Sequence, residues 1–365
     1  MSIFEDLEKV IKINSFTQNK TGVDKVGLVF KKWFEEIGFK TTIYKREVIG
    51  DHLLFESKKT DGEKILLLGH IDTVFPYGEF EKYSEDEKWV YGAGVCDMKG
   101  GNIVALQALR ELSKESEIVN IDVLLVSDEE SGSDDSRALS EKLSKNYDYC
   151  FVFEAAGRNN ELVVSRKGIG TFTISIEGKA SHAGNHYSDG VDANLEASYK
   201  LQQLVKLTDI EKGTTVNVGK IEGGIGANTI SPKANLLFEI RYTNKLERER
   251  LLKQIDIIVN SSYVEGSKST LDGLIQRDVM EFTDKKKLLI NKIEKITKTN
   301  ISTEARGGGS DANIVSKNSL TLDGFGPFGD GDHTIHERAL KSSFFERIDL
   351  VVEILKYHQR EYKII

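Results

Sequence analysis

Continuous hydrophobic runs mark three buried strands in the first half of the chain, at residues 65–68, 123–126 and 151–153. Each run is apolar at successive positions, the pattern expected where both faces of a strand are buried. The intervening stretches 100–115 and 136–146 have helical spacing. The order strand–helix–strand–helix–strand predicts a mostly parallel α/β sheet with right-handed crossovers.

The pattern changes at about residue 168, where apolar and polar residues begin to alternate. Phe172, Ile174 and Ile176 share one face, as in a half-exposed strand. A helix, two strands, a helix and a final strand are expected next, at 191–207, 214–221, 234–242, 246–259 and 269–275. The order β-α-β-β-α-β is typical of a ferredoxin-like α+β fold. We therefore interpret 168–280 as a domain inserted into an α/β domain formed by 1–167 and 281–365.

Composition narrows the class of protein. A chain of 365 residues is long enough for a large domain plus a smaller one. The formal net charge of -8 argues against a nucleic-acid partner. No apolar run approaches the roughly 20 residues that cross a membrane, and the N-terminus lacks the features of a signal peptide. We expect a cytoplasmic protein with no membrane or nucleic-acid partner.

The two cysteines, Cys96 and Cys150, are too few for a disulfide framework. Cys150 lies in an apolar run and is expected to be a buried hydrophobic residue. A nucleophilic role for Cys96 is disfavoured, because no His–Cys pattern accompanies it.

The strands are followed by residues that can carry chemistry. His70 and Asp72 follow the first strand, Glu129 and Glu130 the second, and Glu154 the third. The carboxyl ends of strands are where open α/β sheets place their sites. Because His70 and Asp72 are two apart, their side chains leave on one face, and a carboxylate beside a histidine is common at zinc.

Three further features complete the candidate site. Asp97 lies in the glycine-rich stretch GAGVCDMKGG, whose glycines let the backbone pack closely around a bound group. Glu129 and Glu130 point differently, so one can bind metal while the other acts as a base. His333 lies late in the chain, in GDGDHTIHERA. Taken singly, a histidine at a strand end is usually satisfied locally and an acidic pair is usually solvated. Together, two histidines and several carboxylates match the ligands of zinc or cobalt.

Several motifs together resemble one family over residues from about 5 to 360. They are GHIDTV, GAGVCDMKGG, SDEESGS with FEAAG after it, KASHAG and the late H-x-x-x-E. The chain resembles the zinc exopeptidases, a family that contains glutamate carboxypeptidases, aminoacylases, acetylornithine deacetylase and succinyl-diaminopimelate desuccinylase. The resemblance implies a phosphorylase/hydrolase-like catalytic domain and an inserted domain that serves as a lid and for dimerisation. Departures from the family pattern are small: Ala93, Cys96 and Ala155 replace residues that are often Pro, Ala and Pro.

The resemblance implies two Zn2+ (or Co2+) ions per chain, bridged by Asp97. The implied ligand sets are His70, Asp97 and Glu154 for one ion, and Asp97, Glu130 and His333 for the other. Glu129 would be the general acid/base, and Asp72 would orient His70. His336 competes with His333, but only His333 stands four residues before Glu337, so His333 is the expected ligand.

The resemblance places three substrate-binding residues in the inserted domain: His182, Asn228 and Arg241. In dimeric members the histidine reaches the partner's active site, so a homodimer through this domain is expected. Arg241 shares a strand face with Glu239, away from the domain core, and its planar guanidinium suits a substrate carboxylate. Without the resemblance, an exposed strand arginine would be the simpler interpretation.

Three functions remain open. The leading hypothesis is a carboxypeptidase-like hydrolase that removes a C-terminal amino acid, with glutamate as one candidate, from peptides or folyl-type amides. FEAAG, VSRKGIG, GKASHAG and RGGGSDAN favour the glutamate carboxypeptidase branch. The alternatives are an N-acyl-amino-acid deacylase of the same family and a non-catalytic binding relative. The third is disfavoured because every implied ligand and the base are present.

Overall fold

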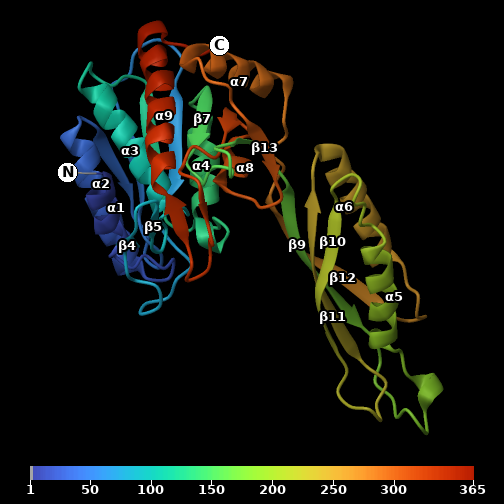
Figure 1. Ribbon diagram of the computed structural model, residues 1–365. Helices are drawn as coiled ribbons and strands as arrows, with labels where there is room; N and C mark the ends of the chain where they lie inside the picture. The colour runs from blue at the N-terminus through green and yellow to red at the C-terminus, as the bar shows by residue number, and fades with distance from the viewer. Residues whose placement is uncertain (1–2) are drawn as a thin grey trace. The chain divides into compact units, whose positions relative to one another are not determined.

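The computed structural model describes residues 3–365, which divide into two compact units (Figure 1). The first unit comprises the chain up to Ser165 together with Phe282–Arg306 and Ser310–Ile365. The second comprises Arg166–Glu281 and the short segment Gly307–Gly309. Within the described residues, no helix has the length and apolar character that a membrane span requires.

The first unit contains a six-stranded sheet with the order β1-β2-β6-β3-β7-β14. Its strands are β1 (Lys40–Tyr44), β2 (His52–Glu56), β3 (Ile65–His70), β6 (Ile121–Val126), β7 (Tyr149–Val152) and β14 (Leu320–Leu322). The four strands β6, β3, β7 and β14 are parallel, as the sequence predicts for the first three. The sequence pattern does not indicate the two strands at the other edge, β1 and β2. Of these, β2 runs antiparallel to both of its neighbours, β1 and β6.

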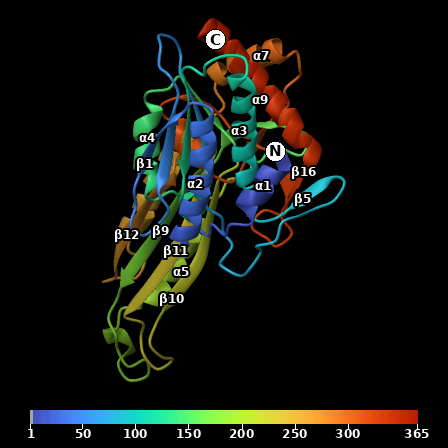
Figure 2. The same ribbon diagram turned by 90° about the vertical axis from the view of Figure 1, so that its left-hand side faces the viewer.

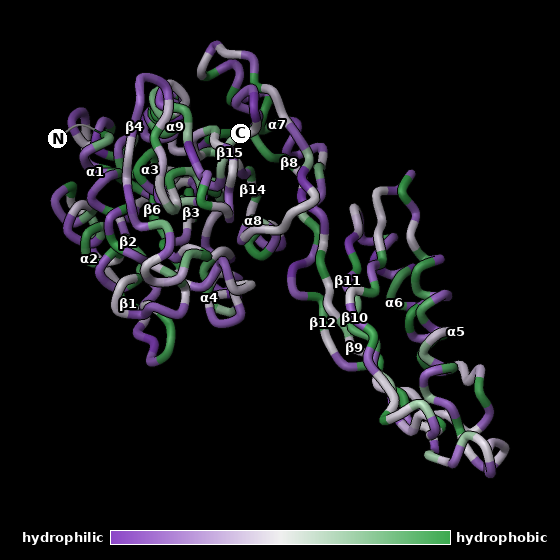
Figure 3. The backbone as a smooth tube through the Cα atoms, turned by 60° about the horizontal axis from the view of Figure 1, so that its bottom comes forward, coloured by the Kyte–Doolittle hydropathy of each residue, from purple (hydrophilic) through white to green (hydrophobic). Residues whose placement is uncertain are grey.

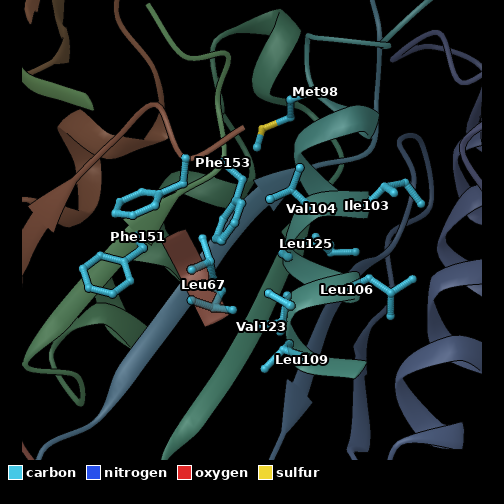
Figure 4. Close-up of a cluster of buried hydrophobic side chains, with 14 of the residues drawn as sticks. Leu67, Met98, Ile103, Val104, Leu106, Leu109, Val123, Leu125, Phe151 and Phe153 are labelled. Carbon is cyan, nitrogen blue, oxygen red and sulfur yellow. The ribbon is translucent and has the colours of Figure 1, made fainter. Parts of the chain in front are cut away.

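Helices cover both faces of this sheet. One face carries α1 (Ile3–Ile11), α2 (Lys20–Glu36), α3 (Lys99–Ser113), α7 (Asp284–Thr297) and α9 (Lys341–Glu361). Ile103, Leu106 and Leu109 of α3 belong to the same buried hydrophobic cluster as the sheet residues Leu67 and Val123 (Figure 4). Each fully buried side chain of this size stabilises the fold by about 1.5–3 kcal/mol.

The opposite face is covered by α4 (Ser136–Ser144) and α8 (Asp311–Val315). Leu66, Leu68 and Leu124, which alternate with the residues of the first face, are fully buried as well. Figure 2 shows α3 and α4 on opposite sides of the sheet. Burial on both faces explains why the strands read as continuous apolar runs, and these runs are green on β3 and β6 in Figure 3.

Side-chain caps fix where several helices begin. Asn19 accepts the backbone N–H of Gly22 at the start of α2, and Thr283 accepts that of Lys286 in α7. Ser310 and Asn313 form a reciprocal capping box at α8, inside the stretch RGGGSDAN. Such caps satisfy backbone donors that the helix itself leaves unpaired.

Two small sheets complete the first unit. In one, β15 (Gly329–Asp330), β16 (Arg338–Leu340), β5 (Trp89–Tyr91) and β4 (Ser84–Glu85) lie side by side in that order. In the other, β13 (Thr303–Arg306) pairs with β8 (Leu162–Arg166). The pairing of β16 with β5 is antiparallel. It joins two distant parts of the chain, the loop that contains His333 and the loop that contains Asp97.

The second unit follows the order β-α-β-β-α-β. Its elements are β9 (Gly168–Glu177), α5 (Ala193–Val205), β10 (Thr215–Gly223), β11 (Lys233–Tyr242), α6 (Lys245–Asn260) and β12 (Lys268–Arg277). The strands form an antiparallel sheet with the order β10-β11-β9-β12. Burial alternates along β9 and β11, because one face packs on α5 and α6 and the other is more exposed.

Candidate metal centre

The six-stranded sheet brings four of the predicted residues to one edge. His70 is the last residue of β3, and β3 lies between β6 and β7. Glu129 and Glu130 follow β6 and begin a short 3-10 turn, and Glu154 follows β7. Because these strands are parallel, their carboxyl ends meet, as the sequence argument requires.

His70, Asp97 and Glu154 form a first group of possible ligands, with one donor atom from each within 4.8 Å of the others. His70 Nε2 lies 3.1 Å from Asp97 Oδ1 and 3.8 Å from Glu154 Oε1. An imidazole nitrogen and two carboxylate oxygens are a donor set that zinc accepts.

Asp97, Glu130 and His333 form a second group on the same distance criterion. His333 Nε2 lies 3.3 Å from Asp97 Oδ2 and 3.1 Å from Glu130 Oε2. One oxygen of Asp97 therefore faces the first group and the other faces the second, which is the geometry a bridging carboxylate needs. His336 belongs to neither group within the described residues.

Burial and mutual repulsion raise the pKa values of two glutamates in the site. Burial and the charge of Asp97 raise the pKa of Glu130 to about 8, and the same two causes raise the pKa of Glu154 well above its ordinary value. Hydrogen bonds to Asp97 and Glu130 raise the pKa of His333 to about 11. Several carboxylates crowded into one buried region repel one another, and a divalent cation would relieve that repulsion.

Asp72 ties the first group to the two glutamates. Its carboxylate Oδ1 lies 3.3 Å from His70 Nδ1 and accepts the backbone N–H of Glu129 at 3.3 Å. Its Oδ2 accepts the backbone N–H of Glu130 at 3.2 Å. The backbone carbonyl of Asp72 is a second acceptor for His70 Nδ1, at 3.1 Å. With both acceptors on that side, His70 Nδ1 carries a proton, so Nε2, which faces Asp97, is the ring nitrogen that would bind a cation in place of a proton.

Glu337 fixes the loop of Asp97. Its buried carboxylate accepts three backbone N–H groups, from Gly94 at 2.9 Å, Cys96 at 3.0 Å and Asp97 at 3.1 Å. Burial raises the pKa of Glu337 to about 7, although these N–H donors oppose the shift. Glu337 is four residues after His333 and binds the loop of Asp97. It therefore links the two segments that carry these candidate ligands, which are far apart in the sequence.

Glu129 lies close enough to both groups to act on a ligand of each through its charge. It is buried, and its charge contributes to the raised pKa values of both Glu130 and Glu154. Its backbone is fixed at both ends: the N–H donates to Asp72, and the carbonyl accepts the N–H of Gly132 at 2.8 Å. A carboxylate in this position can exchange protons with a molecule held between the groups.

The three predicted substrate-binding residues all lie in the second unit, at two different ends of it. His182 and Asn228 are neighbours, since the N–H of Ala183 donates to the Asn228 carbonyl at 3.0 Å. Arg241 lies at the far end of β11, roughly 25 Å along the strand from Lys233. The second unit therefore does not bring Arg241 together with the other two residues.

Arg241 and His182 both have local partners. The Arg241 guanidinium makes a two-point contact with Glu239, at 2.6 and 3.2 Å, and donates to the Gly307 carbonyl at 2.7 Å. His182 Nδ1 accepts the N–H groups of Gly184 and Asn185, both at 3.1 Å. The remaining ring nitrogen of His182 therefore carries the proton and can donate it to a ligand.

Two contacts at the candidate site cannot be inferred from the sequence. In the sequence Glu337 stands out only as part of the H-x-x-x-E motif, and no pattern marks Thr17. Thr17 donates a hydrogen bond to Asp72 across 55 positions of sequence, and Glu337 reaches Asp97 across 240. No periodicity or spacing marks contacts over such separations. His52 and His358 lie outside both ligand groups and bond to Asp135 and to the Glu63 carbonyl.

Comparison with known proteins agrees with this chemistry. The chain is 28% identical to carboxypeptidase G2 of a Pseudomonas species over 97% of its own length and 89% of that protein's. It is 27% identical to acetylornithine deacetylase of Buchnera aphidicola, over 84% of the chain and 85% of the relative.

A solved tripeptidase structure from Staphylococcus aureus matches with a TM-score of 0.83 and 22% identity, over 98% of each chain. That likeness shows a shared fold. Residues 66–357 also match a family described as peptidase family M20/M25/M40. The chain therefore belongs to peptidase family M20/M25/M40 and is a hydrolytic enzyme of the metallopeptidase type.

Proposed function

We propose that the protein is a two-metal carboxypeptidase that releases a C-terminal amino acid, with glutamate as the first candidate, by metal-assisted hydrolysis. The observation that carries this proposal is the position of Asp97, whose two carboxylate oxygens face His70 and His333 separately. The substrate class rests on likeness to carboxypeptidase G2.

His70, Asp97 and Glu154 would hold one divalent ion, and Asp97, Glu130 and His333 the other. Zinc or cobalt suits this mixture of imidazole and carboxylate donors. Such ions, when bound, lower the pKa of water toward about 7 and polarise a carbonyl oxygen.

The chain's own residues carry the proton transfers. Glu129 takes a proton from the attacking water and returns it to the leaving nitrogen, which is the double role a positioned carboxylate can fill. Asp72 keeps His70 in the tautomer that leaves Nε2 available. His182, with its free ring N–H, would donate to the oxyanion that develops on the scissile carbonyl.

The positions of the substrate-binding residues in the second unit support the proposal of a homodimer in which each active site uses residues from both chains. His182 and Asn228 lie at one end of this unit and Arg241 near the other. A single substrate could therefore meet all three if Arg241 came from one chain and His182 with Asn228 from a second copy. In that arrangement the unit would also serve as the lid over the metals. Sedimentation should then report a dimer; an active monomer would remove this role from His182.

Arg241 is proposed to bind the substrate's C-terminal carboxylate, either in place of its contact with Glu239 or in addition to it. Replacing Arg241 with alanine should raise KM for substrates with a free carboxylate much more than for the matched C-terminal amides. If acid and amide substrates lose equally, Arg241 has a structural role through Glu239 and Gly307.

The alternative is an N-acyl-amino-acid deacylase, which the likeness to acetylornithine deacetylase favours. Both reactions break an amide with the same residues, so only substrate preference separates them. We suggest a panel of peptides ending in glutamate or other amino acids, and of N-acetyl amino acids, assayed with the zinc-loaded protein. Higher kcat/KM for the C-terminal glutamate peptides supports the proposal, and preference for the N-acetyl set supports the alternative. The Glu129→Gln protein, assayed in parallel, controls for contaminating peptidases.

A further inference from the structure

The segment between α1 and α2 is attached directly to the strand end that carries the candidate site. Thr73 N–H donates to the Ser15 carbonyl at 2.9 Å, and Thr17 N–H donates to the Thr73 carbonyl at 3.2 Å. The buried ammonium of Lys99 holds the start of the segment, donating to the Ile13 carbonyl at 3.0 Å. Residues 13–17 are therefore fixed from two sides.

Thr17 uses this fixed position to contact Asp72. Its hydroxyl donates to Asp72 Oδ2 at 2.6 Å. Thr17 is 5% exposed and Asp72 is fully buried, so water cannot replace the bond readily. A hydrogen bond to a buried carboxylate is stronger than one between neutral groups, and its loss leaves the charge poorly compensated.

The oxygen that Thr17 contacts also accepts the backbone N–H of Glu130. The other oxygen of Asp72 faces His70 Nδ1 and the N–H of Glu129. The rotation of one carboxylate therefore sets three things at once: the ring plane of His70 and the backbone positions of Glu129 and Glu130. Thr17 contributes a hydroxyl donor, and its bond to Asp72 is shorter than those from the backbone N–H groups of Glu129 and Glu130.

We propose that Thr17 is a positioning residue for the metal centre, which locks the Asp72 carboxylate so that His70 and Glu130 present their ligand atoms correctly. The inference rests on the proposed function, because it treats His70 and Glu130 as metal ligands. It assigns a role in metal binding to the segment between α1 and α2, which contributes no ligand itself.

The test compares Thr17→Val with Thr17→Ser. Valine keeps the shape of threonine and removes the hydroxyl, whereas serine keeps the hydroxyl and removes the methyl group. The matched control is Thr214→Val in the second unit, because Thr214 is also buried and donates to a carboxylate, Glu247 Oε2, at 2.8 Å.

Zinc affinity is measured by competition with a chromophoric chelator, and the visible spectrum is recorded with Co2+ bound; neither requires a substrate. Thr17→Val should weaken zinc binding by about tenfold, at the lower end of the loss seen when a partner of a metal ligand is removed. It should also change the cobalt spectrum. Thr17→Ser should restore most of both properties, and Thr214→Val should leave both unchanged.

Wild-type zinc affinity and an unchanged cobalt spectrum in Thr17→Val would overturn the proposal. A loss shared equally by Thr17→Ser would also overturn it, because the methyl group rather than the hydroxyl would then matter. If the wild type binds metal tightly but cleaves no substrate on the panel, the proposed function fails while the role of Thr17 still stands or falls on the affinities. If the wild type binds no metal, both fail.

Discussion

Asp97 shows how much of the site depends on single side chains. It contacts His70 through one oxygen and His333 through the other, and its backbone N–H is held by Glu337. Hydrogen bonds to the two histidines lower the pKa of Asp97 against the effect of burial, so it is ionised when a cation arrives. The residue thus combines a ligand's charge with a fixed backbone.

Replacing Glu129 with glutamine should abolish turnover, with a loss in kcat of about 10²–10⁴-fold or more, because the proton acceptor is removed while shape is kept. Metal content should stay near that of the wild type, since Glu129 is outside both ligand groups. Steady-state kinetics with elemental analysis of the same preparation checks both parts. A variant with nearly normal kcat would assign the base to another residue.

Replacing Glu337 with alanine should destabilise the metal-free protein by more than about 2 kcal/mol, because buried N–H donors left without an acceptor cost roughly 1–3 kcal/mol each. The donors concerned are those of Gly94, Cys96 and Asp97. Glu337→Gln retains one acceptor oxygen and should lose less. Urea unfolding of both variants measures the effect, and equal stability of Glu337→Ala and wild type would contradict it.

The residues that sequence could predict are those marked by local context. His70 and Glu154 follow buried apolar strands, so their place at the sheet edge could be inferred from the runs before them. Thr17 and Glu337 lie in segments without such a signal. Their partners are distant in sequence, and only the folded chain brings them to Asp72 and Asp97.

At the scale of elements, burial decides which strands could be predicted. β3 and β6 are buried at every position, which produces an unambiguous apolar run. β1 has no buried residue and reads as polar. β2 is buried at its first four positions, but its apolar run is only the three residues between His52 and Glu56. These two strands add an antiparallel edge that carries no ligand, so missing them left the predicted site arrangement unchanged.

The C-terminal end of helix α9 is bonded to the segment just before β3. His358 Nε2 donates to the Glu63 carbonyl at 2.8 Å, and the N–H of Glu63 donates to the Tyr362 carbonyl at 2.9 Å. Burial lowers the pKa of His358, although the Glu63 carbonyl and the charges of Glu63 and Asp148 oppose it. The neutral imidazole is therefore the form that the folded helix favours.

This shift predicts an acid-sensitive anchor. The unfolded chain protonates His358 near pH 6.5, whereas the folded chain does so only at lower pH. The contribution of neutral His358 to stability is thus complete above about pH 6.5, and it is lost as the pH falls toward the lowered value. His358→Gln should flatten the decrease in melting temperature between pH 7.5 and 5.5, and His186→Gln, at an exposed histidine, should not. Identical profiles for His358→Gln and wild type would contradict the prediction.

At the scale of the whole molecule, the chain keeps its metal ligands and its predicted substrate residues in separate units. All five candidate ligands and Glu129 belong to the first unit, and His182, Asn228 and Arg241 belong to the second. Turnover on this account requires both. The change from continuous to alternating hydrophobicity indicates the second unit in the sequence. The separation of His182 from Arg241 within that unit, however, is visible only in the folded chain.

The central claim is that two divalent ions held around Asp97 are required for amide hydrolysis. The most direct measurement is a titration of metal-free protein with Zn2+ while the release of C-terminal glutamate from a short peptide is followed. Without metal no release is expected, and the rate should rise with added zinc to a plateau at two equivalents per chain. Release that is independent of added zinc and resistant to chelators would contradict it, as would no release at saturating zinc from any peptide or N-acyl amino acid.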